Sequence, residues 1–366
     1  MNFRFAILSD PHIALPETIW DHPSRFHLVE ISIPVFEFVI DQLAELDLDF
    51  LLIPGDLTQH GERENHTWLA NRLAKLPYPV YVVPGNHDVL EVQATERAIA
   101  AMEFPQYYQK FGYTDPQQIY YTQEILPGVR LIGLNSNFFD QQGKQIGMGR
   151  IDAQQMQWLQ QVLAEAHEPV VMVMVHHNLI EHLPGQSKHG MGRRYMTKNA
   201  QEVLTLLEQA GVQMIFTGHL HVQDIARRPG ISEITTGSLV SYPHPYRVLQ
   251  FQEDGLGRRW LQVESGQVGS VPGWEDLGTR SREWMGDRSV PFMMRLLTDP
   301  PLSLPPEEAQ PLVKHLKYFW ADIASGDQVF DFPDFPPAIR RYFNRFSAVD
   351  GAGHLHFIDN HSTLLL

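Results

Sequence analysis

The stretch Val80-Tyr81-Val82-Val83-Pro84-Gly85-Asn86-His87-Asp88 begins as an apolar run and ends in a flexible glycine followed by three polar residues. Short apolar runs of this kind are typical of strands buried in parallel sheets. A Gly-Asn-His-Asp tetrapeptide after such a run rarely arises by chance. The stretch therefore predicts a strand whose carboxyl end leads into a functional loop.

Four further apolar runs end in the same way, each followed by a polar cluster. They are residues 3–8 before Asp10-Pro11-His12, 50–53 before Gly55-Asp56, 170–175 before His176-His177-Asn178, and 214–216 before Gly218-His219-Leu220-His221. In open α/β sheets, ligands bind outside the carboxyl ends of the strands. We therefore expect the five clusters to lie at one edge of one sheet.

Segments with helical periodicity lie between these strands, at residues 33–46, 152–167 and 199–211, and we expect the side chain of Asn199 to cap the third. This alternation predicts an α/β fold with right-handed crossovers. Residues 233–236, 246–252 and 259–264 look like strands of a second, more antiparallel sheet. We assign residues 1–265 to a catalytic domain. Residues 266–366, rich in proline and aromatic side chains, form a C-terminal appended region with helices near 307–324 and 337–346.

Composition excludes several classes of protein. With 28 Lys and Arg against 43 Asp and Glu, the net charge of −15 argues against a duplex nucleic-acid partner. The absence of cysteine excludes disulfides and thiolate metal sites, so nitrogen and oxygen must hold any metal. No apolar stretch approaches the roughly 18 residues of a membrane span. The first residues lack the apolar core of a signal peptide, so we expect a cytoplasmic protein. The appended region is expected to pack on the catalytic domain or against a second subunit in a homodimer.

The polar clusters supply one set of metal-ligating side chains, which offer carboxylate, amide and imidazole donors: Asp10, His12, Asp56, Asn86, His176, His219 and His221. Seven ligands with one shared carboxylate fit two metal ions. In extended chain, the Asp-x-His and His-x-His spacings turn both side chains of a pair the same way. Taken alone, Asp10 or Asp56 is equally a helix cap. His177 stays open as the ligand in place of His176, and either histidine suits a core position.

The order of these motifs resembles the calcineurin-like metallophosphoesterase family over roughly residues 3–252. The resemblance implies an α/β (mixed α+β) fold, a four-layer αββα sandwich of two mixed β-sheets flanked by helices. It also implies the distribution of the ligands: Asp10, His12, Asp56 and His221 on one ion, and Asp56, Asn86, His176 and His219 on the other, with Asp56 bridging. His87 is expected to be catalytic beside the leaving group, with Asp88 as the partner of its ring. Asn86, His87 and His177 are expected to contact substrate.

Within that family, the chain looks most like the bacterial class III cyclic-nucleotide phosphodiesterases, on the phrases Ser9-Asp10-Pro11-His12-Ile13 and Thr236-Gly237-Ser238-Leu239. The resemblance implies that a metal-bridged hydroxide attacks a small phosphodiester, with a 3′,5′-cyclic nucleotide as the leading substrate. Glycerophosphodiesters, nucleotide or lipid pyrophosphates and phosphomonoesters are alternatives, as is a metal-binding scaffold without activity. Manganese, iron, zinc and magnesium all tolerate the ligand set. His189, Arg193 and Arg194 lie on an expected loop; a surface position is the default for them, and one arginine facing a substrate phosphate is the alternative.

Overall fold

The computed structural model describes residues 1–20 and 25–366. Its strands are β1 (Asn2–Ile7), β2 (Phe50–Ile53), β3 (Val80–Val82), β4 (Tyr121–Leu126), β5 (Val129–Gly133), β6 (Phe138–Phe139), β7 (Gln145–Ile146), β8 (Val170–Met174), β9 (Met214–Thr217), β10 (Asp224–Arg228), β11 (Ile231–Thr235), β12 (Pro245–Glu253), β13 (Arg259–Gln267) and β14 (His361–Leu365). Its α-helices are α1 (Ser32–Ala44), α2 (Arg63–Leu73), α3 (Phe104–Tyr107), α4 (Ala153–Glu165), α5 (Gly190–Arg193), α6 (Ala200–Gln209), α7 (Leu277–Thr298), α8 (Pro306–Val313), α9 (Phe319–Ser325) and α10 (Pro337–Asn344).

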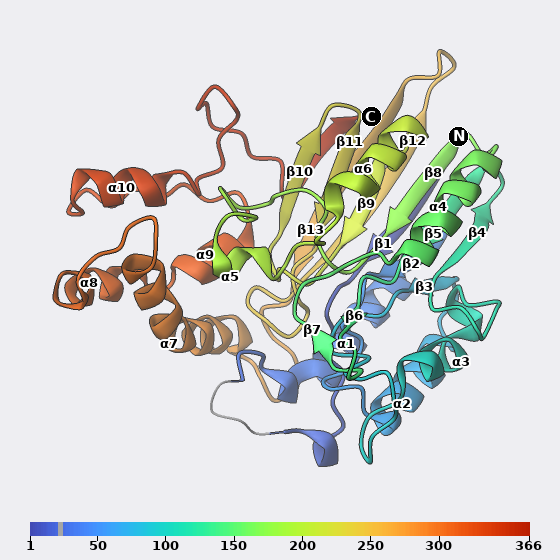
Figure 1. The fold of residues 1–366 in the computed structure, drawn as a ribbon, viewed down its shortest axis with the longest axis horizontal. Helices are drawn as coiled ribbons and strands as arrows, with labels where there is room; N and C mark the ends of the chain where they lie inside the picture. Colours follow the sequence, from blue (N-terminus) through green and yellow to red (C-terminus); the bar gives the residue numbers. More distant parts are fainter. Residues whose placement is uncertain (21–24) are drawn as a thin grey trace.

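Two six-stranded mixed sheets form the centre of the molecule (Figure 1). The first sheet has the order β14-β13-β12-β1-β2-β3, and the second has the order β10-β11-β9-β8-β5-β4. All five strands expected before the polar clusters form, but β1, β2 and β3 lie in the first sheet while β8 and β9 lie in the second. The expectation of one sheet is therefore wrong. Both sheets have an apolar face, and stacking them buries both faces at once.

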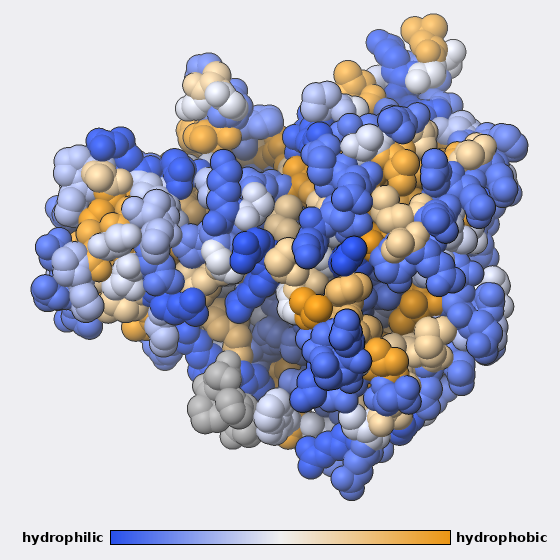
Figure 2. Space-filling model, viewed as in Figure 1, coloured by the Kyte–Doolittle hydropathy of each residue, from blue (hydrophilic) through white to orange (hydrophobic). Residues whose placement is uncertain are grey.

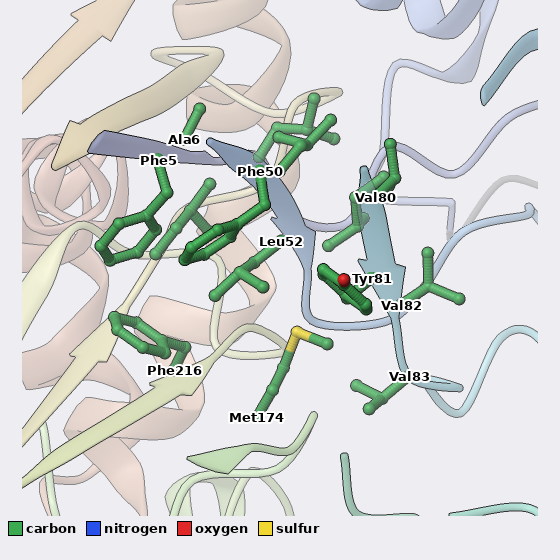
Figure 3. Packing of buried hydrophobic residues seen from close by; sticks show 14 of the residues in the cluster. Phe5, Ala6, Phe50, Leu52, Val80, Tyr81, Val82, Val83, Met174 and Phe216 are labelled. Atoms are coloured by element: carbon green, nitrogen blue, oxygen red, sulfur yellow. The ribbon is translucent and has the colours of Figure 1, made fainter. Parts of the chain in front are cut away.

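Aromatic side chains fill the space between the two sheets (Figure 3). The ring of Phe5 stacks on that of Phe50 in the first sheet, with centroids 4.8 Å apart. It also meets Phe216 of the second sheet edge-on at 5.5 Å. Outside this core, α1 packs in the same apolar cluster as β1–β3, and α4 and α6 pack over the second sheet. The predicted four-layer αββα sandwich is thus confirmed.

The three helices expected between the strands form as α1, α4 and α6, with ends within two residues of the predicted ones. Asn199, however, does not cap α6 through its side chain. Its side chain accepts a hydrogen bond from the backbone N–H of Ile151 (3.1 Å) and donates one to the carbonyl of the same residue (2.9 Å). The amide group is used to fix the loop before α4, so it is not available to the helix end.

The strands expected at residues 233–236, 246–252 and 259–264 form as β11, β12 and β13, but they do not build a separate sheet. β11 runs parallel to β9 in the second sheet, and β12 runs antiparallel to β1 in the first. The prediction of an independent antiparallel sheet is wrong. The edges of β1 and β9 carry unpaired backbone groups, and these later strands satisfy them.

The C-terminal part of the chain is more helical than the sequence indicated. α7 was not expected, because Pro291 interrupts its pattern. The helix expected at residues 307–324 is divided into α8 and α9 by a 3₁₀ turn. α7–α10 share their own apolar cluster, which includes Met293, Phe319 and Phe343, whereas β14 pairs with β13 in the first sheet. The division of the chain near residue 265 and the homodimer stay predictions. Among the residues described, no helix is both long and apolar enough to cross a membrane.

Candidate metal centre

Sharp backbone turns hold most of the predicted ligands. Five of the seven have positive φ angles between 40° and 65°: Asp10, His12, Asp56, His219 and His221. In the part of the chain that the structure describes, only three other non-glycine residues do so. Such strained conformations cost free energy and concentrate at functional sites. The side chains of each Asp-x-His and His-x-His pair therefore converge through left-handed turns, and the expectation that these pairs are extended is wrong.

Two glycines let these turns approach each other closely. A Cβ atom on Gly85 would lie 2.2 Å from both the backbone N and the Oδ1 atom of Asp56. Gly55 has a φ of 101°, and a Cβ there would lie 2.4 Å from Nδ1 of His176. Glycine is therefore required at both positions for Asp56 and His176 to stand where they do.

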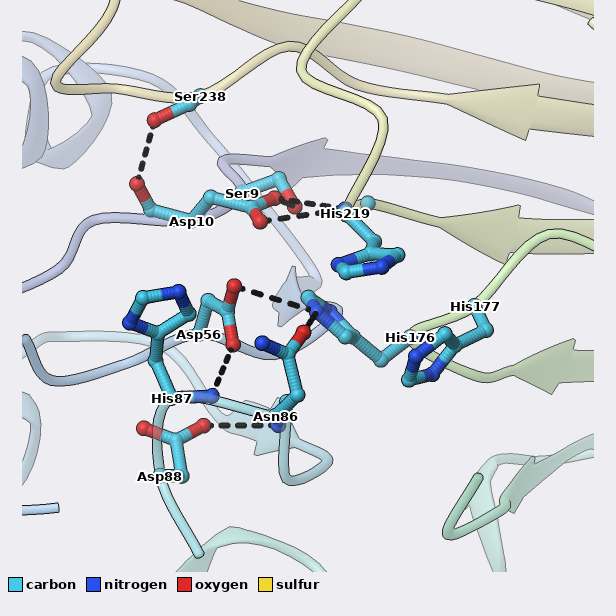
Figure 4. Close-up of polar contacts among 12 residues, drawn as sticks. Ser9, Asp10, Asp56, Asn86, His87, Asp88, His176, His177, His219 and Ser238 are labelled. Atoms are coloured by element: carbon cyan, nitrogen blue, oxygen red, sulfur yellow. Dashed lines mark hydrogen bonds and ion pairs between the residues drawn. The ribbon is translucent and has the colours of Figure 1, made fainter. Parts of the chain in front are cut away.

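One half of the site gathers at the end of β1. Asp10, His12, Asp56 and His221 each offer a ligand atom, and these atoms all lie within 4.8 Å of one another. Nε2 of His221 is 3.0 Å from Oδ1 of Asp10, and Nε2 of His12 is 3.7 Å from Oδ2 of Asp56. The hydroxyl of Ser238 donates to the backbone carbonyl of Asp10 (2.9 Å), which supports this loop (Figure 4).

The other half uses the same carboxylate. Asp56, His176 and His219 form a second group of ligand atoms within 4.8 Å. Nε2 of His176 lies 3.3 Å from Oδ2 of Asp56 and 3.2 Å from Oδ1 of Asn86. Its Nδ1 donates to the carbonyl of Pro54 at 2.8 Å, so Nε2 is the ring nitrogen that faces the site (Figure 4). Asp56 therefore stands between the two groups.

His177 lies behind this half of the site. Its Nδ1 is 2.8 Å from Oγ of Ser136, its ring centroid is 4.2 Å from that of His219, and it is 1% exposed. The structure thus brings His176, and not its neighbour, to Asp56. His177 is not among the residues that line the cavity above the site, and the predicted contact between His177 and substrate stays a prediction.

The electrostatics of the cluster fit bound cations. Burial would raise the pKa of Asp56, but the charge and hydrogen bond of His176, and then His87, hold it well below its usual range. Burial alone would lower the pKa of His176, but the charge of Asp56 raises it to about 9. Burial lowers the pKa of His12 and of His219, so both rings are neutral. Both ring nitrogens of His12 are buried without a hydrogen-bond partner. Buried neutral imidazoles beside an ionised carboxylate are the donor set that divalent metals of the zinc, iron and manganese type take.

His87 lies beside the shared carboxylate and lines the cavity. Its backbone N–H donates to Oδ1 of Asp56 (2.8 Å), and its Nδ1 donates to the carbonyl of Gln59 (2.6 Å). The predicted pairing of its ring with Asp88 is therefore wrong. Adjacent side chains here diverge, and the ring finds a backbone acceptor on the loop after Asp56.

Asp88 holds two loops together instead. Its buried carboxylate accepts hydrogen bonds from the backbone N–H groups of Leu57 (3.1 Å), Thr58 (2.8 Å) and Gly85 (2.8 Å). Burial and the charge of Asp56 raise its pKa to about 7, while these hydrogen bonds act in the opposite direction. The predicted catalytic role of Asp88 gives way to the positioning of the loops that carry Asp56 and Asn86.

The structure adds His27, which the sequence reasoning missed. Its ring centroid lies 4.2 Å from that of His12 and 4.7 Å from that of His221, and the three form a further group with ligand spacing. No strand or glycine precedes His27, so the local pattern carried no signal for it. Hydrogen bonds from α7 to the backbone of the neighbouring Arg25 and Phe26 place it.

The site opens into a cavity of about 420 Å³ (Figure 2). Its catalytic side is lined by Asp56, Asn86, His87, His219 and His221. The rest of its lining includes Arg194 and Tyr195, which adjoin His219, and Arg288, Phe292 and Trp320 of the C-terminal helices. Of the two arginines on the expected loop, Arg194 lines the cavity, and a contact between it and a substrate phosphate stays a prediction.

Comparisons with known proteins agree with this arrangement. Over 226 residues, the chain is 26% identical to a probable cyclic nucleotide phosphodiesterase of Fibrobacter succinogenes, covering 60% of this chain and 76% of that protein. It is 27% identical over 177 residues to a probable glycerophosphodiester phosphodiesterase of Arcobacter nitrofigilis, covering 47% and 56%. A solved dimetal phosphatase of Danio rerio shares the fold, with a TM-score of 0.50, 16% identity and coverage of 72% and 96%.

The sequence model of the calcineurin-like phosphoesterases matches residues 3–223, which is more than half of the chain and includes all seven predicted ligands. Families of this kind hydrolyse phosphoesters with divalent metal ions, and the clustered Asp and His side chains are compatible with a metal site. From the match, the fold and the cluster together, this chain belongs to the calcineurin-like phosphoesterase family and is a hydrolytic metallophosphoesterase.

Proposed function

We propose that the chain is a phosphodiesterase with two metal ions. Asp10, His12, Asp56 and His221 would hold one ion, and Asp56, Asn86, His176 and His219 the other. The observation that carries this proposal is that two separate groups of ligand atoms share the single carboxylate of Asp56. When bound, the ions would lower the pKa of water, orient the phosphoryl group and balance its charge.

The chain's own residues supply the remaining chemistry. The carbonyl of Gln59 accepts the Nδ1 proton of His87, so Nε2 is the ring atom that can exchange a proton at the cavity. We assign to the doubly protonated ring of His87 the transfer of its Nε2 proton to the leaving oxygen, which leaves the neutral ring with its Nδ1 proton, and we place Asn86 beside the phosphoryl group. A poor leaving group such as an alkoxide gains most from a positioned acid.

The substrate we propose is a small phosphodiester, with a 3′,5′-cyclic nucleotide as the leading candidate. The names of the relatives from Fibrobacter succinogenes and Haemophilus influenzae support a cyclic nucleotide, the latter being 23% identical over 62% of this chain. The name of the relative from Arcobacter nitrofigilis supports a glycerophosphodiester as the second candidate. Manganese, iron, zinc and magnesium all suit nitrogen and oxygen donors.

Two substitutions test the metal centre. The full chain, loaded with metal, is assayed on bis(4-nitrophenyl) phosphate, and Asn86→Ala and His219→Ala should each abolish turnover while the circular dichroism spectrum is unchanged. His354→Ala is the matched control, because that histidine is 81% exposed and far from the site in the sequence. Turnover near that of the wild type in either site variant would refute the two-metal assignment.

A substrate panel tests the proposed reaction. It compares 3′,5′- and 2′,3′-cyclic nucleotides, a glycerophosphodiester, a dinucleoside pyrophosphate, a lipid pyrophosphate and a phosphomonoester. A preference for the monoester would remove the diesterase proposal. Retention of metal without hydrolysis of any member of the panel would favour the metal-binding scaffold alternative.

A further inference from the structure

We infer that the C-terminal helices α7 and α9 bind the organic part of the substrate, and that this part carries a planar ring such as a nucleobase. The inference deepens the proposed phosphodiesterase function and rests on it. Both helices lie beyond residues 3–223, which are the part of the chain that the family match covers. Their role therefore has to be argued from the cavity itself.

The cavity has two chemically different sides. One part of its lining consists of His87 and four predicted ligands, Asp56, Asn86, His219 and His221. The other, which we call the aromatic wall, consists of Tyr195, Arg288, Phe292, Trp320 and Arg194. Arg288 and Phe292 come from α7, and Trp320 comes from α9. Figure 2 shows the cavity as a hollow between the C-terminal helices and the sandwich. A phosphoryl group seated on the ligands would therefore direct its ester substituent toward this wall.

The aromatic wall is fixed to the metal ligands. Leu220, which lies between His219 and His221, is 1% exposed and packs in the apolar cluster of the C-terminal helices. Trp284 of α7 donates to the carbonyl of Phe26 at 2.9 Å, and Arg288 donates to that of Arg25 at 2.9 Å. The wall and the ligands are thus held together before any substrate arrives, which reduces the entropy lost on binding.

The side chains of the aromatic wall select a planar group. The rings of Phe292 and Trp320 meet edge-on, with centroids 5.5 Å apart, so together they form a corner with a ring face on each side. Such faces stack on bases of any sequence, and guanidinium groups stack on rings as well as binding anionic oxygens. In this wall, Arg194 already lies 4.7 Å from the ring centroid of Tyr195.

Other diesters use this surface poorly. A glycerol or ethanolamine substituent is flexible, polar and without a ring, so it gains little from aromatic faces. A lipid with two acyl chains exceeds a cavity of about 420 Å³, which lies in the lower half of the usual range for small-molecule sites. A mononucleotide fits both the size and the chemistry.

The test measures selectivity in the full, metal-loaded chain. The value of kcat/KM is determined for 3′,5′-cyclic AMP, which carries a ring, and for glycerophosphoethanolamine, which carries none. Phe292→Leu and Trp320→Leu each keep an apolar side chain in the cluster, and Arg288 is left unchanged because its side chain holds the backbone at Arg25. Each should lower the ratio of the two kcat/KM values about tenfold, in line with the loss of one stacking contact. Arg295→Gln is the matched control on α7, because its side chain is 66% exposed, and its ratio should stay within twofold of that of the wild type.

A second measurement separates the two proposals. Calorimetry of the metal-loaded chain with adenosine 5′-monophosphate should show binding to the wild type and about tenfold weaker binding to Phe292→Leu. If the wild type hydrolyses diesters but binds no nucleotide, or if both site variants leave the ratio of kcat/KM values unchanged, the aromatic wall is refuted and the phosphodiesterase stands. If nucleotide binds through Phe292 but no diester is hydrolysed, the proposed function fails and the wall stands.

Discussion

Substitution of Gly85 by alanine should inactivate the enzyme without unfolding it. The new Cβ atom would lie 2.2 Å from the N and Oδ1 atoms of Asp56, whereas ordinary contact begins at 3.4 Å. The two loops must therefore separate by about 1.2 Å, the difference between these distances. Metal–ligand distances tolerate only about 0.2 Å, so Asp56 would no longer serve both ions. Gly85 does not have a positive φ, and the effect is therefore steric.

The expected magnitudes follow from this displacement. A misplacement of about 1 Å costs about 100-fold in rate, and overpacking costs about 1–3 kcal/mol of stability. We expect kcat/KM on bis(4-nitrophenyl) phosphate to fall at least 100-fold, elemental analysis to show lost metal, and Tm to fall by only a few degrees. Gly255→Ala is the control, because a Cβ there meets no atom within 4 Å. Activity within a few fold of the wild type, with full metal content, would refute the argument.

Three further predictions concern other parts of the molecule. His87→Gln should slow hydrolysis of an alkyl diester about 100-fold or more, but hydrolysis of a 4-nitrophenyl ester far less, because a good leaving group needs no acid. Equal losses of rate on both esters would exclude His87 as the proton donor. His27→Ala should weaken metal retention on dialysis about tenfold, as loss of a supporting residue does, and unchanged metal content would exclude His27 from the centre. Burial and the charge of Asp224 raise the pKa of Asp359 to about 8. The folded protein therefore keeps a proton that the unfolded chain releases above about pH 4, and the free energy of unfolding falls as pH rises between these values. Asp359→Asn should flatten that part of the curve of Tm against pH, and an unaltered slope would contradict the assignment.

Much of the candidate site could be predicted because it depends on local pattern. Apolar runs followed by Gly85-Asn86-His87-Asp88 or by Gly218-His219 mark strand ends wherever they occur in the fold, so the strands were correctly identified, and side chains of their polar clusters do lie at ligand spacing. The expected pairing of Asp88 with the ring of its neighbour His87 could not be judged from local pattern. Asp88 contacts backbone N–H groups some 30 residues away in the sequence, and no spacing rule reveals such a contact.

In the fold, too, some features follow from local pattern and others depend on tertiary packing. The alternation of strands and helices follows from periodicity, because burial of one face dictates the period. Whether β8 and β9 join β1–β3 or build a second sheet depends on which apolar faces meet, and the same sequence pattern suits both. Pro291 hid α7, since proline is a local signal against a helix and only the packing around Met293 overrides it.

The sequence by itself determined the chemistry of this protein: the carboxylates, imidazoles and amide, their order along the chain, and the absence of thiols. These are properties of residue type and of short spacing. Tertiary structure decided which of them meet. It brought His176 and not His177 to Asp56, bound Asp88 to the backbone of two loops, added His27, and placed Phe292 and Trp320 in the same cavity as Asp56 and His219. The physical reason is that a cavity is formed by segments distant in the chain, and their contacts depend on packing that local patterns do not record.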